Sequence, residues 1–188
     1  AVLLGEELHL TNIRAKREKP GLRPQHLTAI EALREICHGR LEGNKVGSSE
    51  IRFKPGREIK SGHYQWDIGT AGSTTLLAMT LLPAACFSQE PMSFKISGGL
   101  FQDFAPSAYH LQYVLLPLLA RMGITASLNI VRPGYVPRGG GIIEVAVKPA
   151  IKVKPIELVE PGKVTSISGV ALSSHLKERQ VSERMANK

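Results

Sequence analysis

Five basic side chains crowd into the ten residues from Arg14 to Arg23, where the only acid is Glu18. The five are Arg14, Lys16, Arg17, Lys19 and Arg23. Arginine forks match phosphate oxygens in two-point geometry. Helix-start amides also favour an anion, and a helix pattern begins directly after this stretch. Residues 12–26 therefore predict a phosphate-binding cradle, although a solvated charge run on a surface loop is an alternative interpretation.

Gln25 and His26 occupy the expected first turn of that helix, beside the basic loop. A histidine at a helix start is often an ordinary polar surface group. Among arginines, however, its ring N–H can give a phosphate oxygen a hydrogen bond. His26 is therefore a candidate for handling phosphate.

The cradle needs a strand before it and a helix after it. Residues 8–13 alternate as a strand, which would deliver Arg14 and Arg17 at its carboxyl end. Apolar residues then recur at helical spacing over residues 26–38, and Gly39 is the expected stop. Residues 49–54 alternate as a further strand before a Pro-Gly turn.

A second unit starts with a strand over residues 64–68 and a glycine- and hydroxyl-rich turn over residues 69–75. Such a turn can hold an anion on backbone N–H groups, but this one lacks the lysine of a P-loop. A tight turn in which Ser73 caps a buried helix explains the same residues. The sequence alone leaves both interpretations open.

The rest of the second unit alternates helices and strands. We expect a strand over 92–97, a helix over 106–122 that bends at Pro117 and ends at Gly123, and strands over 126–131 and 142–147. The last two strands are joined by a loop with a glycine triplet between Arg132 and Arg138. That triplet would admit a phosphodiester or simply kink a hairpin.

Residues 64–149 thus have the order β-α-β-α-β-β, and the first sixty residues fit the same scheme without its opening elements. We predict an α/β (α+β) fold of stacked βαβαββ repeats, with two helices packed on a sheet per repeat. The partial first repeat would cover residues 1–60 and the second 61–150, within a repeat domain 1–158. A connector over 156–162 would lead to a strand over 163–172 and a polar helix over 174–188. Both ends of the sequence look like incomplete structural elements, so we expect the chain to be a fragment of a longer protein.

Composition limits the partners. The net charge of +8 and the pI near 9.7 favour a polyanion, with nucleic acid ahead of a membrane surface. Cys37 and Cys86 form no metal-ligand pattern and are expected to be reduced core residues of a cytoplasmic protein. The most apolar run, residues 76–87, is shorter than the roughly 20 residues that a membrane helix needs.

Four ordered blocks of sequence resemble the RNA 3'-terminal phosphate cyclase family. They are IRAKREKPGLRPQHLTAIEAL, IGTAGSTTLLAMTLLPA, ISGGLFQDFAPSAYHLQYVLLPLLARMG and RPGYVPRGGG. The resemblance covers nearly the whole chain, and it implies βαβαββ repeats with a smaller α/β domain inserted late, of which residues 159–188 would be the start.

The resemblance implies an ATP-dependent ligase-class enzyme that converts an RNA 3'-phosphate into a 2',3'-cyclic phosphate through enzyme-AMP and RNA-adenylate intermediates. Its partners would be ATP, RNA with a 3'-phosphate end and a divalent metal, for which Mg is expected. Arg14, Arg17, Gln25 and His26 match the family's site positions. Pro106 and His110 match positions expected to bind the nucleotide, on the resemblance alone.

The resemblance also implies differences. The family's acidic metal residue would precede Ala1 and its nucleophilic histidine would lie beyond Lys188, so the fragment alone is expected to be inactive. Met79 stands where the family usually has glutamine, and Leu100-Phe101 where it usually has Thr-Asp. The alternative function is that of a cyclase-like RNA-binding protein of ribosomal RNA processing without cyclase chemistry. A purely structural repeat domain is a third hypothesis.

Overall fold

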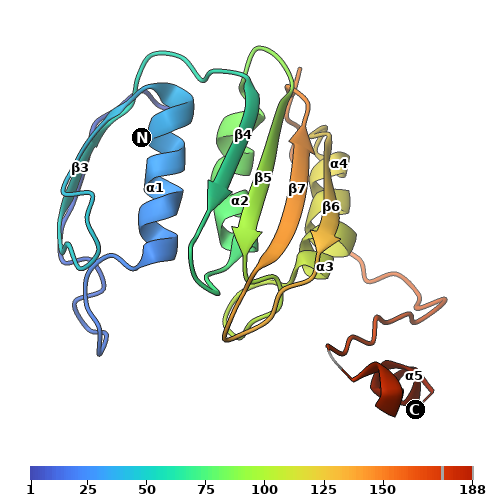
Figure 1. Ribbon diagram of the computed structural model, residues 1–188. Helices are drawn as coiled ribbons and strands as arrows, with labels where there is room; N and C mark the ends of the chain where they lie inside the picture. The colour runs from blue at the N-terminus through green and yellow to red at the C-terminus, as the bar shows by residue number, and fades with distance from the viewer. Residues whose placement is uncertain (175, 188) are drawn as a thin grey trace. The chain divides into compact units, whose positions relative to one another are not determined.

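The computed structural model describes residues 1–174 and 176–187. The chain divides into two compact units, Ala1–Ile156 and Glu157–Lys188, and each is described by itself. The first unit is a mixed α/β structure with two small sheets (Figure 1). No helix among the described residues is both long and apolar enough to cross a membrane.

The first sheet has three antiparallel strands in the order β1-β3-β2. They are β1 (Leu8–Leu10), β2 (Arg40–Glu42) and β3 (Ile51–Lys54). The strand predicted over residues 8–13 therefore ends three residues early. Asn12 and Arg14 have φ angles of 55° and 53°, in the left-handed region, which a strand cannot accommodate. Strand β2 was not predicted from the sequence.

Helix α1 (Pro24–Cys37) begins two residues before the predicted start. Proline has a fixed φ suited to the first helical position, where its missing N–H leaves no bond unmade. At the other end His38, with φ 50°, takes the left-handed position that was expected of Gly39. Gly39 is needed for a different reason, because a Cβ there would lie 2.8 Å from the Lys54 carbonyl oxygen.

The second sheet has the order β4-β5-β7-β6. Its strands are β4 (Gly62–Asp67), β5 (Met92–Gly98), β6 (Ala126–Arg132) and β7 (Gly141–Val147). The β4–β5 pair is parallel and is connected through helix α2 (Thr74–Ala85), whereas β7 is antiparallel to both β5 and β6. The predicted order of elements over residues 64–149 is confirmed.

The helix predicted over residues 106–122 is built from three segments. They are α3 (Ala108–His110), the π-helical turn η1 (Leu111–Leu115) and α4 (Leu116–Arg121). The Leu116 N–H donates to the Leu111 carbonyl, five residues back. The irregularity expected at Pro117 is thus a π turn directly before it, and Gly123, with φ 88°, lies just past the helix end as predicted.

The main core lies between the second sheet and its helices, which cover one face of it (Figure 1). Strand β5 alternates between buried and half-buried residues, so one of its faces packs fully against α2. Cys37 and Cys86 are buried free thiols, as predicted. The largest side chains that are almost fully buried include Leu77, Leu81, Phe94, Ile96, Ile143 and Val145.

The compact unit Glu157–Lys188 differs from the prediction for this part of the chain. Residues 163–172 form no strand, and regular structure is limited to η2 (Lys177–Arg179) and α5 (Val181–Ala186). A strand needs a neighbouring strand for its backbone N–H and C=O groups. No strand is present among the described residues of this unit, 157–174 and 176–187, so residues 163–172 have none to pair with there. Residues 175 and 188 of the predicted helix lie outside the described residues.

Candidate phosphate-binding site

The basic loop is closed at its base by backbone hydrogen bonds. The Gly21 N–H donates to the Ile13 carbonyl at 2.9 Å, so the two ends of the loop meet. The Ile13 and Leu22 N–H groups donate to the Ser49 and Ser48 carbonyls at 3.0 and 2.9 Å. The side chains of Ile13 and Leu22 are buried against Ile51. The charged residues are therefore carried on an anchored loop.

Arg14 organises the inside of this loop. One of its terminal nitrogens donates to the Lys19 carbonyl at 2.6 Å and to the Gly21 carbonyl at 3.1 Å. The side chain is half-buried, and the backbone has the positive φ described above. Carbonyl acceptors leave the guanidinium charge uncompensated. Arg14 thus provides a fixed positive charge, which a solvated charge run would not.

The other basic residues of the loop divide into two groups. Arg23 is half-buried and is the N-cap residue of α1, whereas Lys16, Arg17 and Lys19 are exposed. The Arg17 side chain makes no hydrogen bond or salt bridge within residues 1–174 and 176–187. The structure therefore brings Arg14 and Arg23 together with the start of α1, and it does not place Arg17 there. Arg23 was part of the predicted basic run but was not singled out.

His26 is held as a neutral imidazole. Its Nδ1 accepts a hydrogen bond from the Arg23 backbone N–H at 3.2 Å, and only an unprotonated nitrogen can accept. Burial lowers the pKa of His26, and the positive charges of Arg14 and Arg23 lower it further. With Nδ1 occupied, the proton is on Nε2. The free nitrogen of the ring is therefore a hydrogen-bond donor.

Gln25 links α1 to the start of α2. Its Oε1 accepts a hydrogen bond from the Ser73 backbone N–H at 3.1 Å. With its amide oriented to satisfy both ends, Gln102 also accepts from Ser73 N–H, at 3.1 Å, and donates to the Ala71 carbonyl. Gln102 was not predicted, since no local pattern shows that residue 102 meets residues 71 and 73.

The turn before α2 is a structural cap. The Ser73 hydroxyl accepts from the Leu76 N–H at 3.1 Å, as the capping interpretation required. The Thr74 and Thr75 hydroxyls donate to the carbonyls of Gly99 and Pro106, at 3.0 and 2.6 Å. These three side chains are almost fully buried. Their hydroxyl groups are engaged within the protein and are not displayed to an anion.

Pro106 lies before α3, and His110 is the last residue of α3. The Pro106 carbonyl is fixed by Thr75, and the His110 N–H donates to the Ser107 hydroxyl at 3.1 Å, leaving the exposed imidazole facing solvent. Leu100, one of the positions that differ from the family pattern, is 1% exposed and belongs to the core. Met79 is half-buried.

The glycine triplet forms part of the β6–β7 hairpin. Gly139 lies against the turn before α2, where a Cβ would be 2.9 Å from both the Ala71 Cα and the Thr70 oxygen. The Arg132 Nε donates to the Gly140 carbonyl at 2.7 Å, whereas the Arg138 side chain is exposed. The close backbone approach that the triplet permits is thus made with the protein itself.

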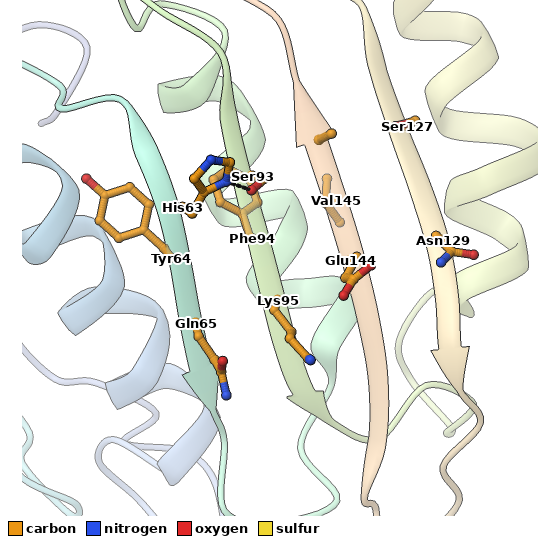
Figure 2. A pocket seen from close by; sticks show the side chains of 11 residues that line it. His63, Tyr64, Gln65, Ser93, Phe94, Lys95, Ser127, Asn129, Glu144 and Val145 are labelled. Carbon is orange, nitrogen blue, oxygen red and sulfur yellow. Dashed lines mark hydrogen bonds between the residues drawn. The ribbon is translucent and has the colours of Figure 1, made fainter.

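A hollow of about 500 Å³ lies elsewhere, on the face of the second sheet away from its helices (Figure 2). His63 and Ser93 approach each other there at 2.5 Å, near Lys95 and Glu144. The hollow is the shallow concave face of a twisted sheet, and its lining includes none of Arg14, Arg23, Gln25 or His26. We therefore place the candidate site at the basic loop.

Comparison with known proteins supports the family resemblance of the sequence blocks. A family model described as RNA 3'-terminal phosphate cyclase matches residues 1–186. Proteins described by the same words are 46% identical over 95% of this chain in Staphylothermus marinus, 42% over 100% in Nitrosospira multiformis and 41% over 98% in Pyrococcus furiosus. The matches cover 50%, 52% and 55% of those proteins. The chain thus spans about half the length of the curated relatives it matches.

Proposed function

Because the chain belongs to the RNA 3'-terminal phosphate cyclase family, we propose that the whole protein uses ATP to convert an RNA 3'-phosphate into a 2',3'-cyclic phosphate. The family match over residues 1–186 is the observation that carries this proposal. The basic loop supports the proposal, since both substrates, ATP and the RNA 3'-phosphate, carry phosphate groups. The net charge of +8 is also suited to a polyanionic substrate.

The reaction would proceed in three group transfers. A histidine nitrogen takes AMP from ATP and pyrophosphate leaves. The RNA 3'-phosphate then takes the AMP from that histidine. Finally the neighbouring 2'-oxygen attacks the 3'-phosphorus, AMP leaves and the 2'-hydroxyl proton is lost. The sequence resemblance assigns the nucleophile to a histidine that is not among the six of this chain.

Within this scheme, Arg14, Arg23 and His26 would bind the RNA phosphate. The geometry of His26 favours this role over that of nucleophile, because its Nδ1 lone pair accepts from Arg23 N–H and its Nε2 carries the proton. A positive group and a neutral N–H donor can both stabilise negative charge that develops on phosphoryl oxygens. Arg17 is exposed on the same loop, and its side chain would contact the RNA once the RNA has bound.

Gln25 would act by position. Its hydrogen bond to Ser73 N–H fixes the first turn of α1 against the turn before α2, and with it the orientation of His26 one residue later. Pro106 and His110 would lie toward the nucleotide. His110 offers an exposed imidazole at the end of α3.

A divalent metal is expected from the family. Among the described residues, no three His, Cys, Asp or Glu side chains come together as a metal-binding group. We therefore derive no step through a metal here. The described residues contribute positive side chains and N–H donors.

We also propose that the first unit consists of related βαβαββ repeats. Its first part runs β1, α1, β2, β3 with sheet order β1-β3-β2, and its second part ends β5, helix, β6, β7 with order β5-β7-β6. In both, the last strand is antiparallel to its two neighbours. The repeat domain would cover 1–158, with 1–60 the later part of one repeat and 61–150 a whole one, and 159–188 would begin an inserted domain.

The test uses the full-length protein with ATP, magnesium and an oligonucleotide that carries a 3'-phosphate. A cyclic end resists phosphatase, so we expect an ATP-dependent rise in the resistant fraction. His26→Ala should slow this conversion, yet protein-bound AMP should still form from labelled ATP. His63→Ala, which changes a histidine on the outer sheet face, is the matched control and should behave as wild type.

Two results would contradict the proposal. RNA binding without any cyclic product would favour a non-catalytic RNA-binding function. Peptide mapping that finds the AMP on His26 would show that this histidine is the nucleophile and not a phosphate-binding donor.

A further inference from the structure

Four aromatic rings form a continuous row beside the candidate site. Tyr135, in the loop between β6 and β7, lies 5.5 Å from Phe101 between ring centroids, and Phe101 lies 5.5 Å from Tyr109. Tyr109 is followed by Tyr113 at 5.9 Å, with the two ring planes only 5° apart. The row therefore runs from one loop across the start of α3 and into the π turn.

Only Phe101 of this row packs against the main core. None of its four residues is fully buried, and Tyr113 at its end is 62% exposed. Within the described part of the chain, the hydroxyls of Tyr109, Tyr113 and Tyr135 make no hydrogen bond to protein. Packing alone would bury such rings or bond their hydroxyls. A stacked row with a free outer ring is instead a surface on which another flat group can stack.

The row starts next to the groups that hold the phosphate-binding site together. Phe101 is adjacent to Gln102, whose amide shares the Ser73 N–H with Gln25. At the other side, Tyr135 shares its loop with Gly139, which contacts Thr70 and Ala71 in the same turn. Residues that flank the aromatic row and the first turn of α1 thus contact the same turn before α2.

Charge near the row suits a nucleic-acid backbone. Arg132 and Arg138 lie in or beside the loop of Tyr135, and both side chains are exposed. One acid, Asp103, lies in the loop of Phe101. Successive bases of a single strand stack on aromatic side chains, while basic groups track the phosphates.

We propose that the row Tyr135–Phe101–Tyr109–Tyr113 is a stacking surface for bases of single-stranded RNA near its 3' end. This inference rests on the proposed function, in which the terminal phosphate binds at Arg14 and His26. Stacking is tolerant of sequence because every base has a π face, so the row would add affinity without choosing a sequence. It would also favour single-stranded ends, since paired bases are not free to stack on protein.

The test measures binding of fluorescent RNA octamers to the full-length protein by anisotropy, without ATP. Tyr113→Ala should weaken binding about five- to tenfold, as expected for the loss of one base–ring contact. Tyr113→Phe keeps the ring and should remain within about twofold of wild type. Phe87→Ala removes an aromatic ring that is 58% exposed at the opposite end of α2 and is the matched control.

An octamer series with one abasic site at each of the last four positions identifies the stacked base. At one position the abasic octamer should bind wild type as weakly as the intact octamer binds Tyr113→Ala, and the variant should not weaken it further. If Tyr113→Ala costs the same affinity at every abasic position, bases do not stack on this ring. If the variant instead raises the KM for ATP and leaves RNA binding unchanged, the row serves the nucleotide and the proposal is wrong.

Octamers with a 3'-hydroxyl separate this inference from the proposed function. The loss caused by Tyr113→Ala should be the same with either end, because the ring contacts a base and not the phosphate. Failure of the protein to cyclise RNA would leave that loss intact. Conversely, normal cyclisation with no effect of Tyr113→Ala on octamer binding would overturn the stacking surface alone.

Discussion

Two loops of the first unit connect a strand to a helix and differ in their side chains. The loop over residues 11–23 precedes α1 and carries five basic residues, whereas the loop over residues 99–107 precedes α3 and has two phenylalanines but no Lys or Arg. Glutamines from both regions, Gln25 and Gln102, meet at the Ser73 N–H. Two strand-to-helix loops that are linked through the Ser73 N–H can thus present different surfaces, one of basic side chains and the other of aromatic rings.

Both loops are closed by backbone hydrogen bonds, and they differ in what their side chains add. The basic loop has a closed backbone base and an internal Arg14 that donates to two carbonyls. The aromatic loop is closed by the Ala108 N–H on the Leu100 carbonyl at 3.2 Å and by the Thr75 hydroxyl on the Pro106 carbonyl, and its rings add contacts with Tyr109 and Tyr135. A charged loop must be fixed by directional bonds because its like charges repel one another. In the aromatic loop the ring contacts that add to these bonds also form its surface.

Replacing Arg14 should give the largest effect, since it serves both the loop and the site. Arg14→Ala should reduce kcat/KM for cyclisation by about 3 kcal/mol of transition-state stabilisation, the upper end for a hydrogen bond to a charged group. The exposed Arg17→Ala should lose about 1.5 kcal/mol. Steady-state kinetics on the full-length protein measures both.

Lys45→Ala, an exposed residue before β3, is the control and should leave kcat/KM unchanged. Equal losses for Arg14→Ala and Arg17→Ala would mean that the half-buried position of Arg14 does not matter for catalysis. The basic loop would then act as a diffuse charge, and its contrast with the aromatic loop would be weaker.

The contact of the β6–β7 loop with the turn before α2 can be broken at a single glycine. Gly139 and Gly140 have φ angles of 68° and 69°, so alanine meets the same backbone strain at either one. Only at Gly139 would the new Cβ lie 2.9 Å from the Ala71 backbone, while nothing lies within 4 Å at Gly140. Gly139→Ala should therefore destabilise the protein by roughly 1–2 kcal/mol more than Gly140→Ala. Urea unfolding of both variants checks this, and equal values would exclude the close contact.

The smallest expected effect concerns pH and the neutral state of His26. Its pKa is lowered in the folded protein, so below about 6.5 the unfolded chain binds a proton that the folded chain does not. Stability should thus fall as pH drops below that value, until the folded histidine also titrates. Wild type should lose more stability than His26→Gln between pH 7.5 and pH 5. The effect is small because the ring is only partly buried.

Urea unfolding at the two pH values measures this difference. A His26→Gln variant that loses as much stability as wild type would show that other groups cause the acid sensitivity. Such a result would also remove the support for an N–H donor at Nε2.

The sequence predicted the elements that have strong patterns. Apolar residues at helical spacing located α1 to within two residues, and alternation located β5 and β7 to within one. Strand β2, three residues with one half-buried side chain, has no alternation long enough to detect. The predicted strand over 163–172 was wrong because alternation alone does not supply a partner strand. The positive φ angles of Asn12 and Arg14, which ended β1, were not visible in the pattern either.

For the candidate site, the sequence predicted which residues are chemically suitable. It did not predict which of them lie inside the loop near His26 and which are exposed. Arg14 and Arg17 look equivalent as neighbouring arginines, yet only Arg14 turns into the loop and lies near His26. Arg23 contacts His26 because the helix starts at Pro24, two residues earlier than expected. Gln102 joins the site through a contact with residues about thirty positions away, which local patterns cannot show.

The π turn at Leu111–Leu115 has a consequence for how the two halves of its helix are oriented. Each residue of an α-helix turns the chain by about 100°, so one extra residue in a turn changes the angular phase between the segments on its two sides. Before the turn, Tyr109 faces the Phe101 ring of the loop over residues 99–107. After it, Leu116 faces the core. The extra residue lets α3 and α4 each keep its own orientation within one helix. Deleting a single residue from 111–115 would therefore rotate either α3 or α4 away from the groups that it contacts.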